Sequence, residues 1–137
     1  MVSMSHLSHM QINVAPGNQS FYKNLLLAMG WSTIYEDDSM YSAAGKNGES
    51  LWFVNATNSA TNDYDGIGIN HLAFGAASQA EVDAAASYLL GNEIELLFDT
   101  PRHRPDFASD ETQTYYQIMF TSPDNLLFEV VYTGPKQ

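Results

Sequence analysis

Apolar and polar residues alternate strictly over residues 9–14, the first periodic segment of the chain. Since successive side chains of a strand point to opposite faces, this alternation predicts a half-buried strand. A strand of this kind buries one face against the core and leaves the other free for function. The apolar face consists of Met10, Ile12 and Val14, and the polar face consists of His9, Gln11 and Asn13.

A helix and three further strands are predicted after this segment. Apolar residues recur at helical spacing from Phe21 to Met29, and Gly30 is a natural C-terminal stop. The Asn-Gly pair at 47–48 marks a hairpin between the last two strands. The predicted order of the first half is therefore β-α-β-β-β. Its remaining strands are 31–35, 40–44 and 49–55.

The second half repeats this order after a polar segment rich in Asn, Thr, Ser and Asp. Ser78 and Glu81 form a capping box, which begins a helix that ends at Gly91. A tight turn with Pro123 joins the arms of a final hairpin. The predicted strands are 70–74, 94–98 and the two arms of the hairpin at 115–133, with a long polar loop at 99–113.

The two halves match in length as well as in order. His9 lies 21 residues before Gly30, and His71 lies 20 residues before Gly91. Two copies of one supersecondary unit predict a single pseudo-symmetric domain. Its predicted extent is 7–133, with module one at 7–56, a linker at 57–66 and module two at 67–133.

A single carboxylate interrupts the last predicted strand, where Glu129 lies between Phe128 and Val130. A lone buried charge is costly unless a metal or a cation accompanies it. Because each helix must cover the apolar face of its strands, the alternation sends His9, His71 and Glu129 to the opposite face. Two histidines and one carboxylate form a common divalent metal site with positions open for substrate.

Composition narrows the range of partners and compartments. The chain has 137 residues, no cysteine, and 5 Lys and Arg against 16 Asp and Glu, for a formal net charge of -11. This acidity argues against a nucleic acid partner, since a phosphate backbone needs clustered cations. No apolar run is long enough to span a membrane, and the first residues lack a secretory signal pattern, so we expect a cytoplasmic protein.

Three motifs resemble those of a known superfamily. They are Ser8-His9-Met10-Gln11-Ile12, then Ile69-Asn70-His71-Leu72-Ala73-Phe74, then Ser122-Pro123-Asp124-Asn125 before Leu127-Phe128-Glu129. With these motifs the chain resembles the vicinal oxygen chelate superfamily, which includes glyoxalase I, bleomycin-resistance proteins, extradiol dioxygenases and fosfomycin-resistance thiol transferases. The resemblance implies an α+β fold of two βαβββ modules, whose sheets curl into a cup with the helices outside. It also implies that His9, His71 and Glu129 hold a divalent ion of Fe, Mn, Ni or Zn.

One departure from the glyoxalase I pattern is informative. Glyoxalase I has a fourth ligand, a Glu, on the last strand of its first module. When residues 51–54 are set against residues 126–129, Val54 takes that position. The missing carboxylate argues against the glyoxalase I reaction, and a three-ligand site resembles the dioxygenase and thiol-transferase branches instead. The scarcity of Lys and Arg argues against the thiol-transferase branch.

Two hypotheses of function follow from the resemblance. In the first, the chain is a metal-dependent lyase, isomerase or dioxygenase acting on a small substrate with adjacent oxygens, as a homodimer whose modules pair within one chain or between chains. In the second, it is a metal-free bleomycin-resistance-type protein that sequesters a small cationic or aromatic molecule, which the acidity favours. The candidate site residues are Glu129 and Tyr115 for catalysis, and Gln11, Trp52, Arg102 and Gln117 for substrate binding.

Overall fold

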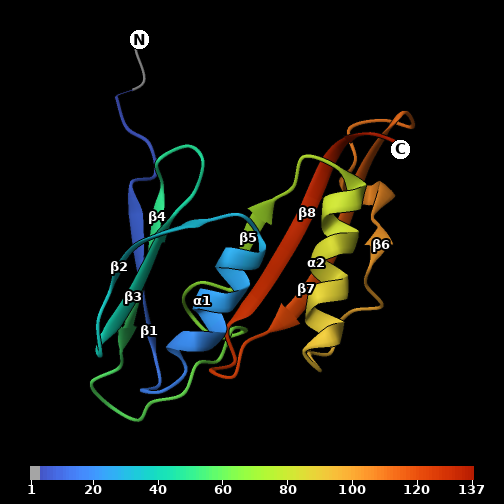
Figure 1. Cartoon of the computed structure of the whole chain (residues 1–137). Coiled ribbons are helices and arrows are strands. Elements are labelled where there is room, and N and C mark those ends of the chain that lie inside the picture. The colour runs from blue at the N-terminus through green and yellow to red at the C-terminus, as the bar shows by residue number, and fades with distance from the viewer. Residues whose placement is uncertain (1–3) are drawn as a thin grey trace. The chain divides into compact units, whose positions relative to one another are not determined.

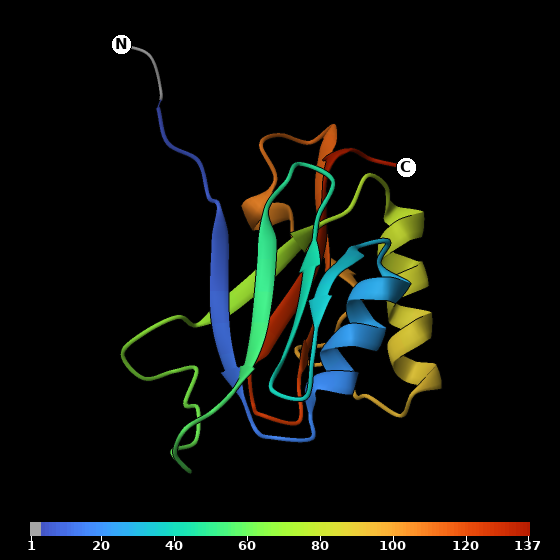
Figure 2. The same ribbon diagram turned by 60° about the vertical axis from the view of Figure 1, so that its left-hand side comes forward.

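The computed structural model describes residues 4–137 of the chain, drawn as a ribbon in Figures 1 and 2. The chain divides into two compact units, Met1–Ala60 and Thr61–Gln137. The boundary lies within the predicted linker 57–66, whereas the assignment of 7–133 to a single domain stays a prediction. Among the described residues, no helix has the length and apolar character needed to cross a membrane.

The first unit has the predicted β-α-β-β-β order. Its four strands form one mixed sheet in the order β1-β4-β3-β2, in which β1 runs parallel to β4 and the other pairs are antiparallel. Helix α1 packs against this sheet. The elements are β1 (His9–Val14), α1 (Gln19–Ala28), β2 (Ser32–Glu36), β3 (Met40–Ala44) and β4 (Ser50–Asn55).

Alternation along the strands builds the core of the first unit. Val14 and Phe53 are each 1% exposed, on the face that α1 covers. The ring of Tyr22 from α1 stacks on Phe53 with 4.4 Å between centroids. In the predicted hairpin between β3 and β4, Gly48 has a φ of +86°, which favours glycine.

The second unit forms a sheet of the same order, β5-β8-β7-β6, with β5 parallel to β8. Helix α2 packs against β7 and β8, and Figure 1 shows it alongside these two long strands. The elements are β5 (His71–Gly75), α2 (Gln79–Gly91), β6 (Arg102–His103), the 3-10 helix η1 (Pro105–Phe107), β7 (Gln113–Thr121) and β8 (Leu127–Pro135).

The predicted capping box and aromatic core are both present in this unit. The Ser78 hydroxyl accepts a hydrogen bond from the Glu81 amide at 3.2 Å, and the Glu81 carboxylate accepts one from the Ala77 amide at 2.7 Å. On the face toward α2, the Phe128 ring stacks between Phe74 and Phe120, with centroids 6.0 and 5.6 Å away. The α+β fold of two βαβββ modules is therefore confirmed.

The predicted strand at 94–98 is wrong. Glu93, Phe98 and Asp99 have φ values of 61°, 58° and 58°, which a strand does not tolerate. Only one backbone bond in this segment reaches β7, from the Leu97 amide to the Met119 carbonyl at 2.8 Å. The strand that borders β7 is instead β6, two residues long, inside the segment predicted to be a loop.

Candidate functional site around Glu129

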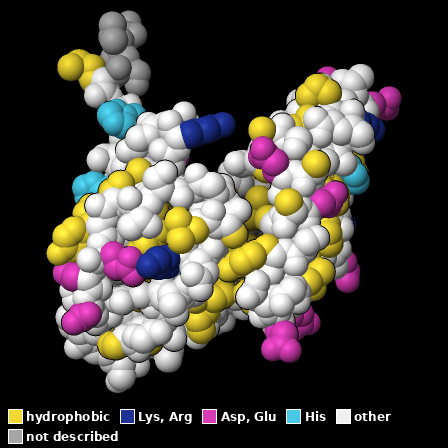
Figure 3. Space-filling model, viewed as in Figure 1, with side chains coloured by type: hydrophobic (Ala, Val, Ile, Leu, Met, Phe, Trp, Pro, Cys, Tyr) yellow, Lys and Arg dark blue, Asp and Glu magenta, His cyan; other side chains and the backbone are white. Residues whose placement is uncertain are grey.

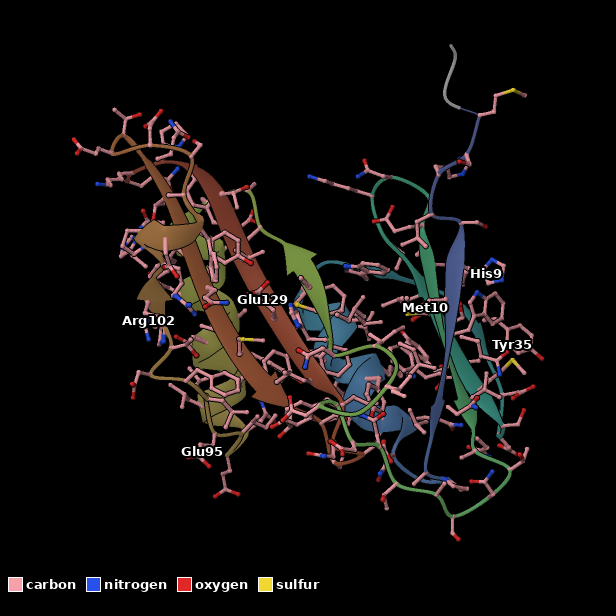
Figure 4. The ribbon with its side chains drawn as sticks, turned by 180° about the vertical axis from the view of Figure 1, so that it is seen from behind. His9, Met10, Tyr35, Glu95, Arg102 and Glu129 are labelled. Carbon is pink, nitrogen blue, oxygen red and sulfur yellow. The ribbon has the colours of Figure 1, made fainter. Side chains whose placement is uncertain are left out.

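Glu129 is the third residue of β8 and is only 2% exposed. It pairs with Ala73 on β5 and with Met119 on β7. Its neighbours Phe128 and Val130 face α2, so alternation directs Glu129 to the opposite face of the sheet. Figure 4 labels Glu129 on this strand. We call this side of the second sheet the Glu129 face.

Two neutral donors from β7 satisfy the Glu129 carboxylate. The Tyr115 hydroxyl donates to Oε1 at 2.8 Å, and the Gln117 amide nitrogen donates to Oε2. Tyr115 and Gln117 were predicted to share a strand face, and both point to the same carboxylate. Burial, followed by the hydrogen bond to Glu129, raises the pKa of Tyr115 to about 12. The phenol is therefore protonated at neutral pH and acts as a donor.

Arg104, which was not among the predicted site residues, completes this cluster. Its Nη1 donates to the Gln117 side-chain oxygen at 3.2 Å, and its guanidinium carbon lies 4.5 Å from the centroid of the Phe107 ring. Phe107 in turn contacts the Tyr115 ring edge-on, with 5.4 Å between centroids. The segment from β6 to η1 thus folds back beside the Glu129 face.

Arg104 also holds Asp106, whose carboxylate lies 3.4 Å from Nη2. This hydrogen bond lowers the pKa of Asp106. Arg102 pairs with Gln117 in the sheet register and shares the Glu129 face, but it is exposed. Arg104 lies one residue beyond the end of β6, so no strand pattern in the sequence distinguished it from Arg102.

His71 lies on the same face of the same sheet as Glu129. It pairs with Leu127, two positions before Glu129 on β8. Its Nδ1 is 2.8 Å from the side-chain oxygen of Asn70. A hydrogen bond through Nδ1 orients the ring and leaves Nε2 as the nitrogen that a metal would take.

His9, Gln11 and Trp52 belong to the first unit, and they share one face of its sheet. His9 pairs with Ser50, and Gln11 pairs with Trp52. The Trp52 indole donates to the Ser50 hydroxyl at 3.0 Å. The Trp52 ring also stacks against Tyr35, with 6.1 Å between centroids. This face is therefore aromatic where the Glu129 face is charged.

The strand register corrects the comparison of the two modules. In the second unit, Glu129 lies two positions beyond the partner of His71. In the first unit, the residue two positions beyond the partner of His9 is Trp52. Trp52 is therefore the counterpart of Glu129, and the assignment of Val54 was wrong by two residues because similarity along one strand does not reveal the pairing partner. Neither Trp52 nor Val54 is a carboxylate, so the first unit lacks the fourth ligand of glyoxalase I at either position.

Within residues 4–137, no group of three or more His, Cys, Asp and Glu side chains is arranged to hold a metal ion. The joint site of His9, His71 and Glu129 stays a prediction. The residues of the second unit fit a divalent metal in their chemistry, since they offer an imidazole nitrogen and a carboxylate. Each carboxylate oxygen has two lone pairs, so the hydrogen bonds to Tyr115 and Gln117 leave acceptor capacity.

In sequence comparisons, no family model and no curated protein matches the chain. Solved structures do match. A protein from Bacillus halodurans, provisionally assigned as a glyoxalase, is 25% identical with a TM-score of 0.78, covering 94% of this chain and 96% of that one. A glyoxalase/dioxygenase from Nostoc punctiforme is 18% identical with a TM-score of 0.73, over 94% and 91% of the two chains.

A third similar structure is the fosfomycin resistance protein FosX from Listeria monocytogenes. It is 23% identical with a TM-score of 0.64, and the match covers 95% of this chain and 94% of that one. These neighbours confirm the predicted resemblance. The chain has the fold of the vicinal oxygen chelate superfamily.

Proposed function

We propose that the chain is a metal-dependent enzyme of the glyoxalase and dioxygenase type, which acts on a small substrate with adjacent oxygens. His9, His71 and Glu129 would hold the metal. The observation that carries the proposal is a carboxylate only 2% exposed that shares one face of one sheet with His71. The similarity of the fold to glyoxalase, dioxygenase and fosfomycin resistance structures supports it.

The chain's own residues supply proton chemistry and orientation at this face. A divalent metal, when bound, acts as a Lewis acid on adjacent substrate oxygens. The Tyr115 phenol, protonated at neutral pH, donates a hydrogen bond to Glu129. In the complex with substrate, the same hydroxyl could donate to a substrate oxygen instead of to Glu129. Gln117 orients the same carboxylate from its other oxygen. We assign substrate contacts to Gln11, Trp52, Arg102 and Gln117.

Metal binding by the purified protein tests this proposal. Metal-free protein is loaded with Fe²⁺, Mn²⁺, Ni²⁺ or Zn²⁺, and the bound metal is measured by elemental analysis after desalting. We expect about one ion per chain for at least one metal. The substitutions H9A, H71A and E129Q should each abolish stoichiometric binding. The absence of binding by the unaltered protein for all four metals would contradict the proposal.

H103A is the matched control for the histidine variants. His103 pairs with Tyr116 in the register, so it lies on the face opposite Glu129. Its replacement removes an imidazole from the same unit and should leave metal binding unchanged. Turnover is then measured with methylglyoxal–glutathione hemithioacetal, catechols and fosfomycin.

A metal-free binding protein is the second candidate, and two observations favour it. The Glu129 carboxylate already accepts hydrogen bonds on both oxygens without a metal. Residues 61–137 hold 12 Asp and Glu against three Lys and Arg, which would attract a cationic molecule, and Figure 3 shows more acidic than basic side chains on the face in view. Saturable binding of bleomycin by metal-free protein, unaffected by H9A, would support this candidate over the enzyme.

A further inference from the structure

The side-chain amide of Gln117 lies between two groups of opposite chemistry. Its nitrogen donates to Glu129, and its oxygen accepts from Arg104 at 3.2 Å. An ionised carboxylate only accepts hydrogen bonds, and a guanidinium only donates them. Reversal of the amide would place oxygen against carboxylate and NH₂ against guanidinium, so both contacts would become repulsive.

Arg104 is itself held in place from three sides. Its backbone amide donates to the Tyr115 carbonyl at 2.7 Å, its guanidinium lies over Phe107, and Asp106 contacts Nη2. The side chain is 25% exposed. The guanidinium itself has three neighbours, which are the Gln117 oxygen, the Phe107 ring and the Asp106 carboxylate.

From this arrangement we infer that Arg104 is a positioning residue, which fixes the orientation of the Gln117 amide and, through it, the Glu129 carboxylate. Gln117 is 2% exposed, so water cannot readily take over the role of either neighbour. Arg102 does not share this role, although it lies nearer to Gln117 in the register. The value of this orientation for metal binding rests on the proposed function, whereas the orientation itself is a property of the metal-free protein.

The first test is NMR spectroscopy of metal-free protein with ¹⁵N-labelled glutamine side chains. The resonance of Gln117 is assigned by its loss in Q117L. We expect R104M to shift and broaden the two Gln117 NH₂ signals, because the amide then loses the donor to its oxygen and is held by Glu129 alone. R104K keeps a donor at this position and should restore most of the signal, and R102M, which removes the same charge, should leave it unchanged.

F107L provides a second variant in case R104M does not fold. It keeps Arg104 but removes the ring beneath the guanidinium, so a smaller shift in the same direction is expected. Unchanged Gln117 signals in both R104M and F107L would overturn the inference. An equal effect of R102M would also overturn it, because the cause would then be charge alone.

The second test is the affinity for the metal that the unaltered protein binds. Loss of an outer residue that orients a ligand typically weakens metal binding 10- to 100-fold, so we expect R104M to weaken it by about tenfold or more. R104K should recover most of this loss, and R102M should stay within about twofold. If the unaltered protein binds no metal, the proposed function fails, and the NMR result still decides the role of Arg104.

Discussion

The two sheets of this protein have the same strand order but carry different side chains on the face opposite their own helix. Both have the strand order in which the first strand of the module pairs in parallel with the last. In each sheet, three residues on neighbouring strands pair with one another in the register and form a row across the sheet. The two rows have no residue type in common. The row of the first unit is Ser42, Trp52 and Gln11, and that of the second is Met119, Glu129 and Ala73.

The second strand of each module, which lies at one edge of its sheet, is a further difference between the two units. In the first unit this strand is β2, five residues that are all exposed, with a shift of register against β3 between Thr33 and Tyr35. In the second it is β6, two residues long and followed by η1. This irregular segment supplies Arg104 and Phe107 to the Glu129 face. The repeat therefore builds the scaffold and supplies the two β7 donors to the carboxylate, whereas the departure from the repeat adds Arg104 and Phe107 beside them.

Replacement of the two counterpart residues tests this contrast most strongly. If only the second sheet provides the carboxylate ligand, E129L should weaken metal binding at least about 100-fold, or about 2.7 kcal/mol. W52L, the equivalent change in the first unit, should leave metal affinity within a few-fold. Isothermal titration calorimetry measures both. Equal losses in the two variants would show that the two rows do not differ in this respect.

Two tyrosines that donate to carboxylates at the same distance provide the next comparison. Tyr115 donates to the buried Glu129, and Tyr35 donates to the exposed Asp37, each at 2.8 Å. We expect Y115F to cost about 1–3 kcal/mol of unfolding free energy, because a buried charged acceptor loses its donor. Y35F should cost much less, since water replaces the donor. Urea denaturation of both variants gives the comparison, and a larger loss in Y35F would contradict it.

Periodicity predicted the parts of this fold in which local pattern and tertiary structure agree. The alternation around His9 and Glu129 gave the correct faces, and the Ser78 capping box gave the correct helix start. Residues 94–98 misled because their apolar run resembles a strand, whereas the positive φ values of Glu93, Phe98 and Asp99 turn the chain at both ends of that run.

The details of the site depended on contacts that a single sequence does not contain. Trp52 emerged as the counterpart of Glu129 only from the pairing of β1 with β4. Arg104 is the arginine that donates to Gln117. It lies between the end of β6 and the start of η1, where the chain changes direction. Both corrections come from pairing and chain direction, which composition and spacing do not determine.

A smaller difference between the two rows concerns satisfied and unsatisfied polar groups. The Ser42 hydroxyl is fully buried and has no hydrogen-bond partner within the part of the chain that the structure describes. Since an unpaired buried hydroxyl is costly, S42A should be neutral or stabilise the fold by up to about 1 kcal/mol. Urea denaturation measures the change. A loss of more than about 1 kcal/mol would show that the hydroxyl has a partner after all.

The turns before the counterpart strands β3 and β7 provide the smallest expected effect. Asp37 accepts hydrogen bonds from the Ser39 amide and hydroxyl, both at 2.8 Å, and Asp110 accepts them from the Thr112 amide and hydroxyl at 2.8 and 2.6 Å. The bonds from Ser39 and Tyr35 lower the pKa of Asp37 to about 2, and those from Thr112 lower the pKa of Asp110.

A carboxyl whose pKa is lower in the folded state stabilises the fold above its unfolded pKa, and this contribution is lost as pH falls through the folded pKa. D37N keeps the acceptor oxygen of the turn but removes the charge. It should therefore lower the melting temperature slightly at pH 7, and the difference should disappear between about pH 4 and pH 2. D110N should behave in the same way in the second unit, with a smaller loss because fewer groups donate to Asp110. Melting curves at pH 7, 4 and 2 measure both variants, and a loss that persists at pH 2 would show that the turn depends on shape and not on charge.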